Sequence, residues 1–85
     1  MVNHASYSPD GKYIVAAFSD GTIRILDDET GQVIRTIEGH TGQVNSLNCS
    51  PDGRKVVSAS SEDNAIKVWD VYTGKLKSVF TFNSE

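Results

Sequence analysis

The sequence has few of the features that mark secreted or membrane-spanning proteins. Cys49 is its only cysteine, so neither an intrachain disulfide nor a cysteine-rich zinc site can form. A lone thiol fits a reducing compartment. Residues 1–4 have neither the charged nor the apolar segment of a signal peptide. No apolar run approaches the roughly 18 to 20 residues that cross a bilayer. We therefore expect a cytoplasmic, intracellular protein with no membrane partner.

Positive charge and catalytic motifs are also scarce. Eight basic residues face eleven acidic ones, and the basic residues are scattered singly apart from Arg54 and Lys55. A nucleic-acid surface needs a basic stripe, so no nucleic-acid partner is expected. The two histidines have dissimilar surroundings, and the chain has no nucleophile motif, phosphate loop or metal-ligand spacing. The sequence therefore predicts no enzyme, no metal and no cofactor.

What the sequence does contain is an internal repeat. Ser8-Pro9-Asp10-Gly11 recurs as Ser50-Pro51-Asp52-Gly53 at a spacing of 42 residues, and Thr30-Gly31 recurs as Thr73-Gly74 at 43. One extra residue therefore sits just before Asp63. In each Ser-Pro-Asp-Gly, the proline presets a turn and the glycine accepts a left-handed backbone. A period of 42 to 43 residues is typical of four-stranded propeller blades.

Each copy predicts four short strands, because runs rich in β-branched and apolar residues alternate with turn signals. The expected strands are 2–8, 13–19, 22–27 and 32–38 in the first copy, and 43–49, 55–60, 65–70 and 75–82 in the second. Short connections make each copy an antiparallel meander. We therefore predict an all-β fold of two four-stranded antiparallel blades, residues 1–42 and 43–85.

Three separated motifs in the second copy carry a resemblance to a known family. At Gly39-His40, Ser50-Pro51-Asp52-Gly53 and Trp69-Asp70, the chain resembles the WD-repeat (WD40) β-propeller family, and the resemblance covers essentially the whole chain. It implies that the second copy is a near-consensus blade and the first a degenerate one. It also implies a hydrogen-bonded network of four side chains inside a blade, with a structural and not a catalytic role.

The network implied by the resemblance has one open assignment. Its members here are His40, Ser58, Asp63 and Trp69, with Ser60 as the alternative to Ser58 because of the extra residue. A buried indole N–H needs an acceptor, which a hydroxyl can supply.

The first copy departs from this pattern. Ala16 and Leu26 stand where the second copy has Ser58 and Trp69, and only Asp20 remains of the four. We expect the first copy to be held by apolar packing, through Ile14, Val15, Ile23, Ile25 and Leu26.

Two blades cannot close a propeller, which has about four to eight, and they leave apolar faces open. Aligned on the repeat, Glu85 of one copy leads in register to Met1 of the next. Two explanations stay open. The chain assembles head to tail into a ring, as a homotrimer with six blades or a homotetramer with eight. Alternatively, it is an excised or engineered two-blade fragment of a longer WD40 protein, with self-assembly as its only activity.

The resemblance also implies the function of a protein-interaction scaffold. Family members bind peptides or proteins on the propeller face that carries the loops between the second and third strands and between successive blades. The positions of this chain expected on that face are Asn3, Phe18, Ser19, Gln43, Asn45 and Glu62. They form no conspicuous aromatic or charged cluster, so the sequence does not indicate which peptide or protein would bind.

Overall fold

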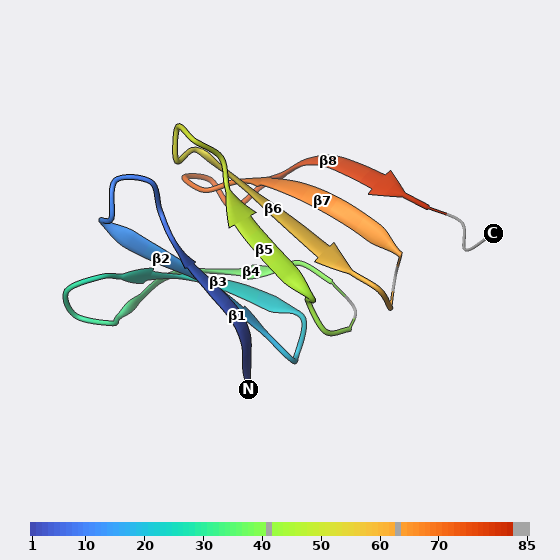
Figure 1. The fold of residues 1–85 in the computed structure, drawn as a ribbon, viewed down its shortest axis with the longest axis horizontal. Helices are drawn as coiled ribbons and strands as arrows, with labels where there is room; N and C mark the ends of the chain where they lie inside the picture. Colours follow the sequence, from blue (N-terminus) through green and yellow to red (C-terminus); the bar gives the residue numbers. More distant parts are fainter. Residues whose placement is uncertain (41, 63, 83–85) are drawn as a thin grey trace.

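The computed structural model describes residues 1–40, 42–62 and 64–82, and every regular element in these ranges is a β-strand. The strands form two antiparallel four-stranded sheets, ordered β1-β2-β3-β4 and β5-β6-β7-β8 (Figure 1). We call them sheet one and sheet two. The strands are β1 (Val2–Tyr7), β2 (Tyr13–Phe18), β3 (Thr22–Asp27), β4 (Val33–Glu38), β5 (Ser46–Cys49), β6 (Lys55–Ser60), β7 (Ala65–Asp70) and β8 (Leu76–Thr81).

The hairpin turns follow from their aspartates and glycines. The carboxylate of Asp10 accepts hydrogen bonds from the Ser8 hydroxyl at 2.7 Å and from the Lys12 N–H at 3.0 Å. These bonds lower the pKa of Asp10. Gly11 and Gly53 close the two equivalent turns with φ of 74° and 73°, a left-handed conformation that suits glycine. The turn prediction from the Ser-Pro-Asp-Gly repeat is confirmed.

The predicted strands agree with the observed ones to within two residues at each end, except at β5. This strand begins at Ser46 and not at Gln43. The Ser60 hydroxyl donates to the Gln43 carbonyl at 2.7 Å, and the Gln43 N–H donates to the Glu62 carboxylate at 2.8 Å. Side chains thus take the backbone groups that a longer β5 would have paired with β6.

The core lies between the two sheets. Their edge strands β1 and β5 run close together (Figure 1). The core includes side chains from both sheets and from the segments that flank β5 and β7. Its buried members are Val15, Ala17, Ile23, Ile25, Ile37, Val44, Leu47, Val56, Trp69 and Val71.

The expected packing of the first copy is only partly correct. Val15, Ile23 and Ile25 lie in the core, as expected. Ile14 and Leu26 are half-buried and lie on the opposite face of sheet one, because alternate residues of a strand point to opposite faces. Among the described residues, no helix has the length and apolar character needed to cross a membrane.

Candidate interaction site

One end of the molecule gathers the segments expected to bind partners. The β2–β3 turn, the connection from β4 to β5 and the β6–β7 turn all lie at this end, which we call the His40 end. The opposite end, which we call the SPDG end, carries the β1–β2, β3–β4, β5–β6 and β7–β8 turns. The connection from β4 to β5 contains the boundary that the sequence predicts between the two blades.

Beneath the His40 end, three of the four predicted network side chains meet at one hydroxyl. The indole N–H of Trp69 donates to Ser58 Oγ at 2.9 Å, and Nε2 of His40 lies 2.7 Å from the same atom. All three side chains are buried. A hydroxyl has one donor and two acceptor sites, so Ser58 accepts from the indole and can still pair with either tautomer of His40.

The structure distinguishes Ser58 from Ser60. The Ser60 hydroxyl bonds the Gln43 carbonyl instead, away from the indole. Asp63, the fourth predicted member, lies outside the described residues. Its counterpart Asp20 in sheet one is exposed and accepts from the Thr22 hydroxyl at 2.6 Å and the Thr22 N–H at 3.0 Å. The Thr22 hydroxyl bond is the main cause of the lowered pKa of Asp20. Asp20 therefore caps its turn and does not complete a second network.

Backbone contacts connect the network to sheet one. The carbonyl of Gly21, in the β2–β3 turn, accepts from the N–H groups of Gly39 and His40 at 3.2 and 3.1 Å. The Lys67 ammonium of sheet two donates to the Gly39 carbonyl at 2.7 Å. A Cβ on Gly39 would lie 3.1 Å from Ile23 and 3.2 Å from Trp69. This connection therefore packs tightly between the sheets and fixes their relative position at the His40 end.

Four of the six expected partner-binding residues are exposed at this end and come from both sheets. Asn3 of β1 donates from its side chain to that of Gln43 at 3.4 Å. The Asn45 side-chain oxygen accepts from the Ser61 N–H at 2.8 Å. Glu62 holds the Gln43 backbone, as described above. These four exposed polar side chains form the polar cluster of the His40 end.

The other two expected residues, Phe18 and Ser19, are half-buried. The Arg24 guanidinium stacks on the Phe18 ring at 4.2 Å from its centroid. The Ser19 N–H donates to the Met1 carbonyl at 2.8 Å. They lie on the sheet-one side of the His40 end, where Phe18 pairs with Val2, the neighbour of Asn3 in β1. Within the described residues, no group of three or more His, Cys, Asp or Glu could hold a metal ion.

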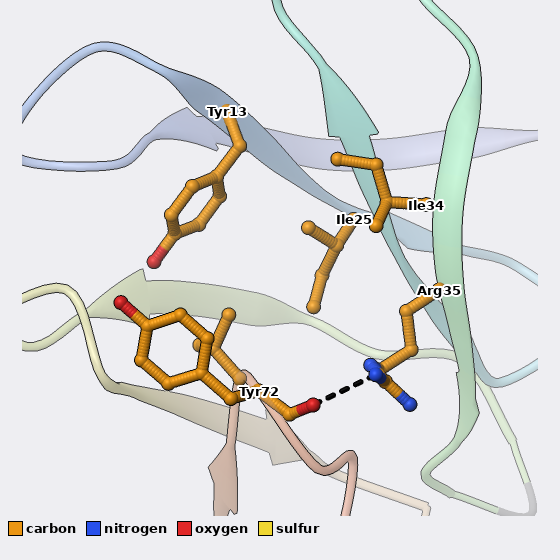
Figure 2. A pocket seen from close by; sticks show the side chains of 6 residues that line it. Tyr13, Ile25, Ile34, Arg35 and Tyr72 are labelled. Carbon is orange, nitrogen blue, oxygen red and sulfur yellow. Dashed lines mark hydrogen bonds between the residues drawn. The ribbon is translucent and has the colours of Figure 1, made fainter.

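Two contacts at the SPDG end are not predicted by the sequence motifs, and Figure 2 shows the first of them, between Arg35 and Tyr72. Arg35 of β4 donates to the Tyr72 carbonyl of sheet two at 2.7 Å, and the Tyr13 hydroxyl donates to the Gly53 carbonyl. Burial raises the pKa of Tyr13 to about 12. The sequence signal for these contacts was a difference between the two copies, since Tyr13 and Arg35 are replaced by Lys55 and Ser78 at the equivalent positions of the second copy.

The same contacts border a small cavity between the sheets. Its volume is about 150 Å³, and Figure 2 shows Tyr13, Ile25 and Ile34 of sheet one opposite Tyr72. Arg35 and Val71 complete the lining. The cavity is apolar apart from the phenols and the guanidinium at its rim, and the guanidinium already bonds a backbone carbonyl.

Two family sequence patterns match the chain. One, described as "WD domain, G-beta repeat", matches residues 31–70. The other, described as "Anaphase-promoting complex subunit 4 WD40 domain", matches residues 1–49. Together they cover both sheets, except β8 and its preceding turn.

Individual relatives are similar to the chain over nearly its full length. Human "WD repeat-containing protein 36" is 39% identical over 75 residues, which are 88% of this chain and 8% of that protein. "WD repeat-containing protein 1" of Bos taurus is 36% identical over 87 residues, covering 99% of this chain and 14% of the relative. The chain thus spans about a tenth of these relatives' length.

Solved structures show the same arrangement of strands. The β-propeller domain of Cps50 (Swd1) from Myceliophteria thermophila superposes with a TM-score of 0.89 at 30% identity, over 95% of this chain and 24% of that one. The WD40 β-propeller domain of Doa1 gives a TM-score of 0.86 at 34% identity, over 96% of this chain and 27% of that one. The two sheets are therefore arranged like neighbouring blades of a propeller.

Proposed function

Because the chain belongs to the WD-repeat family of β-propeller proteins, we propose that it is a non-catalytic protein-interaction module that binds a peptide or protein segment at its His40 end. The observation that carries this proposal is the polar cluster of Asn3, Gln43, Asn45 and Glu62, exposed at one end and supplied by both sheets.

The packing beneath the cluster supports a binding role. The buried network of His40, Ser58 and Trp69 holds the connection from which Gln43 projects. A surface on a rigid support loses little conformational entropy when a partner binds. Amide and carboxylate groups can donate to and accept from an extended peptide backbone, so the partner we propose is a peptide segment in an extended conformation.

A peptide-display selection on the purified protein tests this function. Peptides selected on the wild type should lose binding at least tenfold when Gln43→Ala and Glu62→Ala are combined. The matched control is Lys12→Ala combined with Glu29→Ala, which removes exposed side chains at the SPDG end. Peptides that bind the control and the double variant equally would show that the site lies elsewhere.

A second part of the proposal concerns the association of several copies of the chain. We propose that copies of the chain associate head to tail, three or four to a ring, in the cytoplasm. Support comes from the apolar side chains left exposed on the outer faces of the two sheets, among them Tyr7, Val57 and Phe80, since surfaces of this kind mark association sites. Native mass spectrometry should give three or four times the 9.2 kDa of one chain. A folded monomer at micromolar concentration would overturn this part alone.

A further inference from the structure

We infer that the two outer faces of the chain are the two halves of one interface between copies, and that Arg24 of one copy donates a hydrogen bond to the Phe82 carbonyl of its neighbour. This inference rests on the proposed association and specifies its surfaces. The outer face of sheet two packs on the outer face of sheet one of a second copy, in the way sheet one packs on sheet two within the chain.

The outer face of sheet two repeats the face that sheet one buries. Val57 and Phe80 are 39% and 53% exposed, whereas the equivalent Val15 and Ile37 of sheet one are 0% and 4% exposed. Other apolar positions on this outer face are Ala59, Ile66 and Val68, equivalent to Ala17, Ile23 and Ile25 in the core. The outer face of sheet two is therefore built like a surface that covers another sheet.

The outer face of sheet one repeats the face that sheet two buries. Ala5 is exposed, although the equivalent Leu47 is 1% exposed in the core. Ile14, Ala16 and Leu26 follow on the same face, equivalent to Val56, Ser58 and Trp69. The two outer faces differ from each other and each matches one side of the internal interface. Such surfaces form heterologous contacts and not a two-fold dimer.

The backbone at Phe82 is already placed as it is at Gly39. The Phe82 N–H donates to the Asn64 carbonyl at 3.0 Å, as the Gly39 N–H donates to the Gly21 carbonyl at 3.2 Å. Asn64 and Gly21 both have positive φ. Phe82 and Ile66 line a hollow of about 350 Å³ at this edge. At the equivalent place in the internal interface, Gly39 lies against Ile23 and Trp69.

The large and small side chains change sides between the internal interface and the interface between copies. In the internal interface a glycine at position 39 lies against a tryptophan at position 69. In the interface between copies, the larger Phe82 stands in the glycine's place and the smaller Leu26 in the tryptophan's.

Arg24 supplies the polar contact. Its equivalent, Lys67, donates to the Gly39 carbonyl at 2.7 Å across the internal interface. Arg24 lies on the outer face of sheet one, where its guanidinium stacks on Phe18 and pairs with Asp20 at 3.6 Å, and its side chain is still 35% exposed. By the same geometry, the carbonyl that Arg24 would reach is that of Phe82 in the neighbouring copy.

The test isolates a single interface by blocking one face in each of two chains. Ala5→Asp places a charge on the outer face of sheet one, and Val57→Asp places one on the outer face of sheet two. Both sites are exposed in the single chain, so each variant should remain folded, as checked by circular dichroism and Trp69 fluorescence. Alone, each should sediment as a monomer; mixed, they should form a one-to-one complex. A variant that dimerises alone would overturn the heterologous pairing.

The same pair then tests Arg24 by titration calorimetry. Arg24→Gln in the Val57→Asp chain, whose sheet-one face is free, should weaken the mixed complex about tenfold or more, as expected for loss of a charge-assisted hydrogen bond. Arg24→Lys should keep most of the affinity, since Lys67 makes the equivalent bond. Arg24→Gln in the Ala5→Asp chain is the matched control and should change nothing.

The outcomes separate the two proposals. A wild-type monomer, with no complex on mixing, overturns both the association and this inference. A mixed complex whose affinity is unchanged by Arg24→Gln leaves the association standing and overturns the role of Arg24. Equal weakening from Arg24→Gln in either chain would show that the residue acts on folding and not on the contact.

Discussion

At the scale of single residues, Gly21 has the most demanding position in the chain. Its φ is 91°, and a Cβ at this position would overlap the His40 carbonyl oxygen. Gly11 has a φ of 74°, but nothing lies within 4 Å of the Cβ it lacks. Comparing substitutions at Gly21 and Gly11 therefore separates the free-energy cost of a left-handed backbone from the cost of a steric overlap.

Gly21→Ala should destabilise the protein by about 3 kcal/mol or more, because the backbone of His40 has to move. Gly11→Ala should cost only about 1 to 2 kcal/mol, the penalty of the left-handed conformation. Urea denaturation followed by Trp69 fluorescence measures both. Equal losses would mean that the contact between Gly21 and His40 is unimportant.

Ser58 is the residue on which the buried network depends. Ser58→Ala leaves the Trp69 N–H and His40 Nε2 without their shared partner, and a buried unsatisfied group costs about 1 to 3 kcal/mol. We expect a loss in that range or above it from thermal or urea unfolding. Ser46→Ala, at an exposed position of β5, is the control and should change stability by less than about 0.5 kcal/mol. A loss no larger than the control's would argue against the network's structural role.

At the scale of elements, the contact between β2 and the β5–β6 turn should lose its stabilising effect at alkaline pH. Burial raises the pKa of Tyr13 to about 12, above the 10.0 of a free tyrosine. The folded chain therefore holds this proton where the unfolded chain releases it. The stabilisation is fully present below pH 10 and is lost as the pH rises through 12.

Urea midpoints measured between pH 9 and pH 12 test this expectation. They should fall more steeply for the wild type than for Tyr13→Phe, which has no phenol to ionise but keeps the ring. The two proteins differ only by this hydroxyl, so the difference between the curves reports Tyr13. Parallel curves would contradict the raised pKa.

The elements were largely predictable from sequence, because turn chemistry and apolar runs are local signals. Both Ser-Pro-Asp-Gly turns and all eight strands follow from them. The predicted start of β5 was wrong, because the side chains that bind Gln43 are distant in sequence: Ser60 ends β6 and Glu62 lies in the turn after it. The contacts of Arg35 and Tyr13 were missed because their acceptors are backbone carbonyls, and the sequence marks them only by a difference between the two copies.

At the scale of the whole molecule, association and stability should be linked. If copies cover each other's outer faces, the melting temperature should rise with protein concentration, because dissociation then accompanies unfolding. A hundredfold dilution should lower it by several degrees. The chain carrying both Ala5→Asp and Val57→Asp should melt at one temperature over the same range. A wild type that behaves like this control would contradict the association.

The two sheets are held together by different contacts at the two ends of the molecule, and this difference determines how the sheets can separate. At the His40 end the chain itself joins the sheets, and Lys67 and the network reinforce the joint. At the SPDG end the contacts between the sheets in the described residues include the hydrogen bonds of Tyr13 and Arg35 and apolar side chains around a cavity of about 150 Å³. We expect the sheets to open as a hinge whose axis lies at the His40 end. Slow amide exchange should therefore be lost first beside the SPDG turns and last around Ser58.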